Sequence, residues 1–131
     1  MKTKGALIRE FNQPWKIEEI EMGDPQKGEV KVQMEASGMC HSDHHLVTGG
    51  IPMFGFPVLG GHEGAGVVVE VGEGVEGVAV GDHVVMSFIP SCGKCPSCQA
   101  GLRNLCDLGA GLLAGTAISA ATHRIHTADG Q

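Results

Sequence analysis

The sequence has few basic residues and no long apolar run. Only 9 lysines and arginines stand against 15 aspartates and glutamates in 131 residues, which gives a formal net charge of -6. This acidic balance disfavours a surface that binds nucleic acid or an anionic membrane. No apolar stretch approaches the roughly 20 residues that a membrane-spanning helix needs. We therefore expect neither nucleic-acid nor membrane partners.

The chain also lacks an apolar signal segment, because it opens with the polar run Met1-Lys-Thr-Lys. We expect a cytoplasmic protein in a reducing compartment, where disulfides are rare. There is no repeat, linker or low-complexity tract, and 131 residues suit a single domain. The chain is too short to hold a Rossmann domain as well, so we expect one domain over residues 1–131 and no Rossmann domain.

Turn-forming residues are abundant, with 21 glycines and 6 prolines. They predict short strands separated by many turns. The expected strands cover residues 4–10, 15–21, 29–36, 65–71 and 83–88, with a short helix over 42–47. The third strand alternates, with Val30, Val32 and Met34 on one face, as in a half-buried strand. The pattern predicts a mostly-β, barrel-like domain.

Four of the five cysteines occur in one loop, at residues 90–107: Cys92, Cys95, Cys98 and Cys106. Gly93, Pro96 and Gly101 let the backbone fold tightly between them, so four thiolates can surround one tetrahedral ion. We favour a closed structural Zn²⁺ site, which stabilises a fold without performing chemistry.

Two alternatives for this loop stay open. The first alternative is a pair of disulfides, although disulfides are typical of an oxidising compartment and not of a reducing one. An iron–sulfur cluster is the other, but its bacterial pattern places the fourth cysteine three residues on and follows it with proline. In this sequence the last gap is seven residues and Asp107 follows.

The fifth cysteine, Cys40, opens the run Cys-His-Ser-Asp-His-His, and Gly-Gly-His-Glu follows at residues 60–63. One cysteine with a histidine and a carboxylate suits an open catalytic zinc site, which keeps a position for water or substrate. Taken alone, Cys40 could be a small buried hydrophobe and His62 a hydrogen-bonded core imidazole. Their presence beside a four-cysteine loop favours a second metal site.

Three motifs in order carry a family resemblance: Cys40 with Ser42 and Asp43, the run Gly61-His62-Glu63, and the four-cysteine loop. Together they resemble the amino-terminal part of zinc-dependent medium-chain alcohol dehydrogenases, over residues 4–113. Residues 39–43 and 90–101 look most similar to nicotinoprotein alcohol dehydrogenases, which keep NAD bound and use an artificial nitroso acceptor. The resemblance implies a GroES-like fold.

The resemblance also implies the ligands of a catalytic zinc ion. Cys40 and His62 would bind the ion, and Glu63 would sit close behind it. Asp43 would accept the other ring N–H of His62, which fixes the tautomer of that ring. The four cysteines of the loop would bind the structural zinc ion.

Three further residues have roles implied by the resemblance. Ser42 would hydrogen-bond the substrate hydroxyl and pass its proton through the cofactor ribose towards His45. His41 falls where the family places a basic residue, often arginine, against the cofactor pyrophosphate. His44 has no implied role, and we expect it at the surface.

The implied reaction is hydride transfer between an alcohol, which becomes an aldehyde or ketone, and NAD(H), with Zn²⁺ as a Lewis acid. The complete enzyme is expected to be a homo-oligomer. In the family a dinucleotide-binding domain and another zinc-ligating cysteine follow, whereas Cys106 is the last cysteine here. We therefore expect a catalytic-domain fragment that is inactive alone. The alternative is a stand-alone zinc-binding module without catalysis.

Two glycine patterns resemble dinucleotide-binding turns without their context. Residues 72–77 fit G-x-G-x-x-G but precede another strand instead of a helix, so we expect a hairpin connection. Residues 109–114 fit the looser form but follow the cysteine loop, and we expect a glycine-rich loop. From about residue 115 onward we expect a partly disordered tail, because strands that should pair with it are missing.

Overall fold

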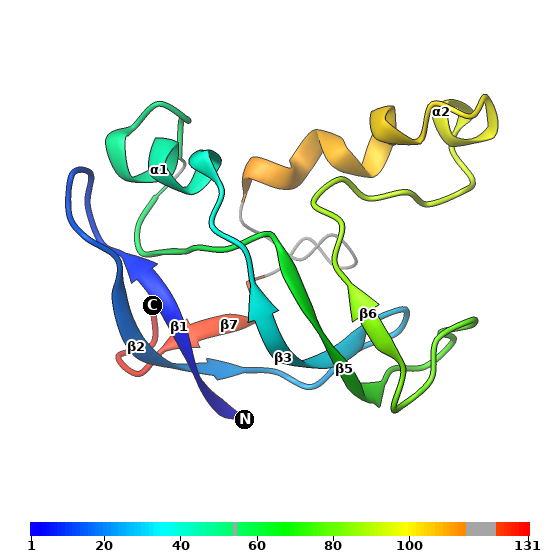
Figure 1. Ribbon diagram of the computed structural model, residues 1–131, viewed down its shortest axis with the longest axis horizontal. Coiled ribbons are helices and arrows are strands. Elements are labelled where there is room, and N and C mark those ends of the chain that lie inside the picture. Colours follow the sequence, from blue (N-terminus) through cyan, green and yellow to red (C-terminus); the bar gives the residue numbers. More distant parts are fainter. Residues whose placement is uncertain (54, 115–122) are drawn as a thin grey trace.

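The computed structural model describes residues 1–53, 55–114 and 123–131, which form seven strands in two antiparallel sheets (Figure 1). The first sheet has the order β4-β1-β2-β7, with β1 at Lys2–Ile8, β2 at Lys16–Met22, β4 at Val58–Leu59 and β7 at Ile125–Thr127. The second has the order β3-β5-β6, with β3 at Val30–Ser37, β5 at Gly64–Val71 and β6 at His83–Val85. The described chain is therefore mostly β, as the sequence predicts.

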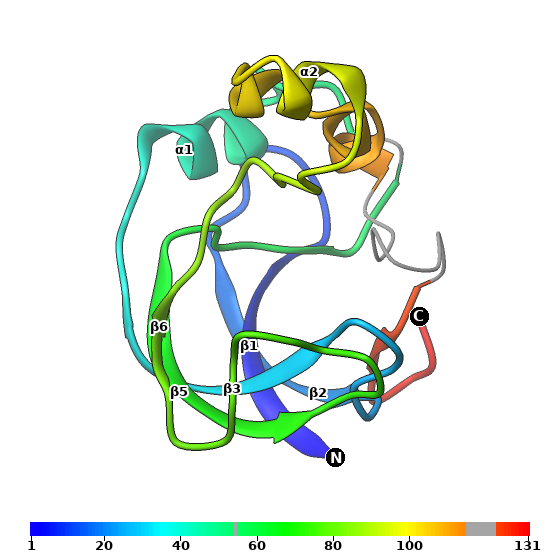
Figure 2. The same cartoon turned by 90° about the vertical axis from the view of Figure 1, so that its right-hand side faces the viewer.

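The helical segments are short: α1 at His41–Thr48, α2 at Pro96–Gln99, and two 3-10 helices, η1 at Arg103–Leu105 and η2 at Asp107–Ala114. Figures 1 and 2 show them gathered at one end of the molecule, above the curled strands. No helix among residues 1–53, 55–114 and 123–131 has the length and apolar character needed to cross a membrane.

Local sequence explains where α1 starts and ends. The Asp43 carboxylate accepts a hydrogen bond from the backbone N–H of Cys40 at 3.3 Å, which supports the first turn. Gly49 ends the helix in the left-handed conformation, at φ 78°, which glycine adopts without a steric penalty. The expected helix at residues 42–47 is thus confirmed, one residue longer at each end.

The apolar core is small and lies between the strands. Among the described residues the buried apolar side chains on the strands are Leu7, Ile8, Ile20 and Val68, and Cys98 and Cys106 are buried separately within the cysteine loop. Ile8 and Val68 are the most deeply buried, at 1% and 0% exposure. Because the core has so few members, each one contributes a large share of the apolar burial.

Strand β2 offers a matched test of this core. Ile20 is 4% exposed and Ile17 is 69% exposed on the same strand. We expect Ile20→Ala to lower the free energy of unfolding by about 3 kcal/mol, because it removes buried methyl groups and leaves a cavity. Ile17→Ala should lower it by less than about 1 kcal/mol. Urea unfolding of both variants measures the difference, and equal losses would contradict the assignment of Ile20 to the core.

The five expected strands are all present with shifted ends, but the face pattern expected for the third strand is wrong. In β3 every residue from Gln33 to Ser37 is exposed, and Met34 is 42% exposed. The register against β5 shifts between Lys31 and Val32 and again between Met34 and Ala36. Each irregularity interrupts the two-residue alternation, so the face predicted to be buried is not continuous.

Two further expectations are corrected at the carboxyl-terminal end. Residues 109–114 belong to the 3-10 helix η2 and do not form a glycine-rich loop. The expected disorder of the tail concerns residues 115–122, which lie outside the described residues, and residues 123–131. For the latter it is wrong, because β7 pairs with β2 through Ile20, Glu21 and Met22. The hairpin expected at residues 72–77 is confirmed, since β5 and β6 are antiparallel neighbours.

Candidate metal centres

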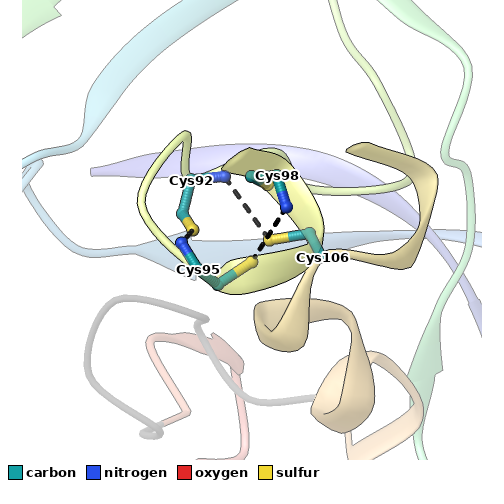
Figure 3. Close-up of side chains that lie close together, drawn as sticks. All are labelled: Cys92, Cys95, Cys98 and Cys106. Atoms are coloured by element: carbon teal, nitrogen blue, oxygen red, sulfur yellow. Dashed lines mark hydrogen bonds between the residues drawn. The ribbon is translucent and has the colours of Figure 1, made fainter. Parts of the chain in front are cut away.

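Four thiols converge within the loop that follows β6 (Figure 3). Cys92 precedes α2, Cys95 caps it, Cys98 lies within it and Cys106 follows η1. Their sulfur atoms all lie within 4.8 Å of one another. Four Zn–S bonds of about 2.3 Å in a tetrahedron need sulfur atoms roughly 4 Å apart, so the described loop can close around one ion with little movement.

Backbone N–H groups point at these sulfur atoms. Cys92 Sγ accepts hydrogen bonds from the backbone of Lys94 at 3.4 Å and Cys95 at 3.3 Å. Cys95 Sγ accepts one from Cys98, and Cys106 Sγ one from Cys92, at 3.5 and 3.4 Å (Figure 3). These dipoles favour the thiolate, which is the form that binds metal.

The pKa values of the thiols follow from these contacts. The N–H groups of Lys94 and Cys95 lower the pKa of Cys92 to about 6. Burial opposes ionisation of Cys98, but the Gly93 backbone N–H and the neighbouring thiols outweigh it and lower its pKa. At Cys106 the N–H of Cys92 favours the thiolate, yet burial and the adjacent thiols raise the pKa. The contacts within the loop thus favour the thiolate at Cys92 and Cys98 and disfavour it at Cys106, and a cation bound among the sulfur atoms would relieve this opposition.

A second cluster joins the start of α1 to the start of β5. Donor atoms of Cys40, His62 and Glu63 lie within 4.8 Å of one another. Cys40 and His62 are half-buried, whereas Glu63 is exposed. One thiol, one imidazole and one carboxylate suit Zn²⁺, and three donors leave a coordination position open.

The Asp43 carboxylate contacts both segments of this second cluster. Its Oδ1 lies 3.5 Å from His62 Nδ1 and accepts the backbone N–H of Gly61 at 3.3 Å. Its Oδ2 accepts the backbone N–H of Cys40. One carboxylate therefore holds both donor segments, and with Nδ1 of His62 directed at Asp43, Nε2 remains for an ion.

Two residues at this cluster carry no signal in the sequence. The Phe88 ring packs against His62, with ring centroids 5.1 Å apart. Gly38 donates its backbone N–H to the Glu63 carbonyl oxygen at 2.8 Å. A Cβ at residue 38 would overlap Glu63 Oε2, so the absence of a side chain there makes room for the carboxylate. Neither residue type is a metal ligand, which is why sequence reasoning missed both.

We expect Gly38→Ala to displace the Glu63 carboxylate and to weaken zinc binding at this cluster about tenfold. Gly55→Ala is the matched control, because a Cβ at residue 55 meets no atom within 4 Å. Competition with a zinc chelator, read as zinc ions retained per chain, measures the change. A loss of equal size in both variants would show that the effect does not depend on room for the carboxylate.

The remaining predicted site residues all lie on α1. His41 is its first residue and Ser42 its second. His41, His44 and His45 are exposed, as expected for His44, and Ser42 is half-buried. The rings of His44 and His45 contact the ring of His41. The proton path through Ser42 and His45 and the phosphate contact of His41 stay predictions.

Comparison with known proteins identifies one family for this chain. The family of alcohol dehydrogenase GroES-like domains matches residues 26–129. Alcohol dehydrogenase B of Mycobacterium tuberculosis is 77% identical over 125 residues, which are 95% of this chain and 33% of that protein. The NDMA-dependent alcohol dehydrogenase of Amycolatopsis methanolica is 52% identical over 88% of this chain and 31% of its own length. The chain thus spans about a third of the length of these relatives.

A solved structure agrees with these matches. The crystal structure of an alcohol dehydrogenase zinc-binding domain protein from Burkholderia ambifaria superposes with a TM-score of 0.90 at 34% identity. The match covers 100% of this chain and 35% of that one. The similarity in sequence therefore extends to the path of the backbone.

Proposed function

The chain belongs to the family of alcohol dehydrogenase GroES-like domains, and from this we propose that it is the catalytic-domain part of a zinc-dependent alcohol dehydrogenase. Family membership confirms the resemblance drawn from the cysteine and histidine motifs, and it confirms the GroES-like fold. The relatives are about three times the length of this chain, and the proposed activity is that of an enzyme of their length.

The cluster of Cys40, His62 and Glu63 carries the proposal. It combines a thiol, an imidazole and a carboxylate from two separate segments, and Asp43 holds both segments. A purely structural zinc site encloses its ion with four protein donors, whereas this cluster has three and is partly exposed. A zinc ion held there would act as a Lewis acid on the oxygen of an alcohol or aldehyde.

Residues of the chain complete the proposed chemistry. Cys40 as a thiolate and His62 as a neutral imidazole would hold the ion, with the Glu63 carboxylate as the third donor. Ser42 would accept the proton of the alcohol and pass it towards His45. His41 would face the phosphates of a bound NAD(H), which a further part of the enzyme would hold. Cytoplasmic location and homo-oligomerisation stay predictions.

The four-cysteine loop has a different proposed role. Cys92, Cys95, Cys98 and Cys106 would bind a structural zinc ion. Cys98 and Cys106 are buried at 5% and 4% exposure, so the site leaves little access for a substrate. The ion would fix α2 and η1 relative to each other and close the loop that follows Phe88.

A chimera tests the proposed activity. In it, the matching segment of M. tuberculosis alcohol dehydrogenase B is replaced by this chain. We expect it to oxidise a primary alcohol with NAD or a nitroso acceptor. Cys40→Ser in the chimera should lower kcat/KM by at least about 10³-fold, because several kcal/mol of Lewis-acid stabilisation are lost.

A surface variant, Lys27→Ala, is the control for the chimera and should keep its activity. Full activity of the Cys40→Ser chimera would overturn the proposal. In that case the alternative, a non-catalytic zinc-binding module, would be favoured, and the loss of Cys40 and His62 should then leave the metal content of the chain unchanged.

A further inference from the structure

Three exposed imidazoles stand together on α1, outside both clusters described above. On this helix His41 lies three residues before His44 and four before His45, the two spacings at which side chains are neighbours. The ring centroids of His41 and His45 are 4.8 Å apart, and those of His41 and His44 are 5.3 Å apart. His41 is therefore the shared member of two close imidazole pairs.

These separations match those of two imidazoles bound to one metal ion. Metal–nitrogen bonds of about 2.0–2.1 Å at a tetrahedral angle place the two ring centroids about 5 Å apart. The rings now meet at 84° and 51°, so binding requires rotation of the rings about their Cβ–Cγ bonds. All three side chains are exposed, and this torsion is broad for histidine.

The surroundings of His45 leave one of its nitrogens for an ion. Its Nδ1 is turned towards Gly50, where a Cβ would lie only 2.7 Å from it. Nε2, on the opposite edge of the ring, is then the nitrogen that can turn towards His41. The carboxylate of Asp43, on the same helix, already contacts Cys40, Gly61 and His62. It therefore adds negative charge nearby without acting as a ligand of the ion.

We propose that His41, with His45 and His44, forms a third metal site that binds an exchangeable divalent cation of the kind imidazole prefers, namely Zn²⁺, Ni²⁺ or Cu²⁺. The site needs no donor from either of the two cysteine-containing clusters. Because all its donors are exposed on one short helix, it holds its ion more weakly than those clusters do.

One consequence rests on the proposed function, whereas the site itself does not. His41 and His45 are the residues proposed for the cofactor phosphates and for the proton path. A cation bound between them would occupy both imidazoles. Excess divalent metal should therefore inhibit the enzyme without removing zinc from its other sites.

Nickel titration of this chain tests the site by binding and not by activity. The zinc-loaded chain is freed of excess metal and titrated with Ni²⁺ near neutral pH, by calorimetry and by line broadening of histidine ring protons. We expect one Ni²⁺ per chain, with broadening of the His41, His44 and His45 signals. His41→Asn should weaken binding at least about tenfold, and His45→Asn or His44→Asn should weaken it less.

Two controls decide how the titration is interpreted. His83 is exposed at the start of β6, away from α1, and His83→Asn should leave Ni²⁺ affinity unchanged. Zinc retained per chain should stay constant during the titration. Unchanged affinity in His41→Asn, equal weakening in His83→Asn, or release of one zinc for each nickel bound would each overturn the proposal.

Discussion

Replacing Cys98 with serine is expected to remove one zinc ion per chain and to unfold the loop from Cys92 to Cys106. Cys98 is 5% exposed, and its sulfur lies within 4.8 Å of the other three. A serine hydroxyl stays protonated near neutral pH, so it leaves an incomplete set of three thiolates around the ion. Metal binding to such sites contributes apparent folding free energy on the order of 10 kcal/mol, so the loss of a ligand should be severe.

Two measurements follow the Cys98→Ser variant. Zinc content per chain should fall by one ion, and amide exchange across residues 92–106 should accelerate at least about 100-fold. Cys40→Ser is the matched control, because it also removes one thiol but lies outside the loop. It should lower zinc content while leaving exchange in the loop unchanged. Unaltered zinc content in Cys98→Ser would contradict a closed four-thiolate site.

The strands could be predicted largely because their signal is local. Residues 65–71 form a run rich in valine between glycines, and they appear as β5 with one added residue. The hairpin between β5 and β6 could be predicted because a strand, and not a helix, follows residues 72–77. In both cases the deciding information lies within about ten residues of sequence.

The short strands β4 and β7 could not be predicted for a physical reason. β4 has two residues and β7 three, too few for a periodic pattern. Each exists because a distant strand offers hydrogen-bonding groups: Val58 and Leu59 pair with β1, and residues 125–127 pair with β2. Such pairing depends on tertiary contacts that the local sequence does not encode.

The candidate metal clusters also differ in how much of each could be predicted from local sequence. Spacing alone predicted the four-cysteine cluster, because its ligands share one loop. The meeting of Cys40 with His62 required the folding of two segments. Their presence beside the four-cysteine loop favoured a second metal site, and the family resemblance named its ligands. The room that Gly38 leaves for Glu63 and the packing of Phe88 on His62 appear only in the structure, since neither residue type binds metal.

The two clusters should also lose their ions at very different rates. With excess chelator near neutral pH, we expect one zinc per chain to leave at least about 100-fold faster than the other. The fast ion belongs to Cys40, His62 and Glu63, a set with three donors and an exposed carboxylate. The slow ion belongs to the four-cysteine loop, where Cys98 and Cys106 are buried. A chelator can attack the open coordination position first, whereas the closed site must lose a thiolate before it can be attacked.

Assignment of the two rates relies on removing each cluster separately. Cys40→Ser should abolish the fast phase and leave the slow one, and Cys98→Ser should abolish the slow phase. Asp43→Asn keeps all seven proposed donors but weakens the contact of residue 43 with Nδ1 of His62. It should therefore accelerate the fast phase alone by about 10- to 100-fold. Equal rates of loss for both ions in the unsubstituted chain would contradict the proposed difference in donor number. The distinction between a catalytic and a structural centre depends on that difference.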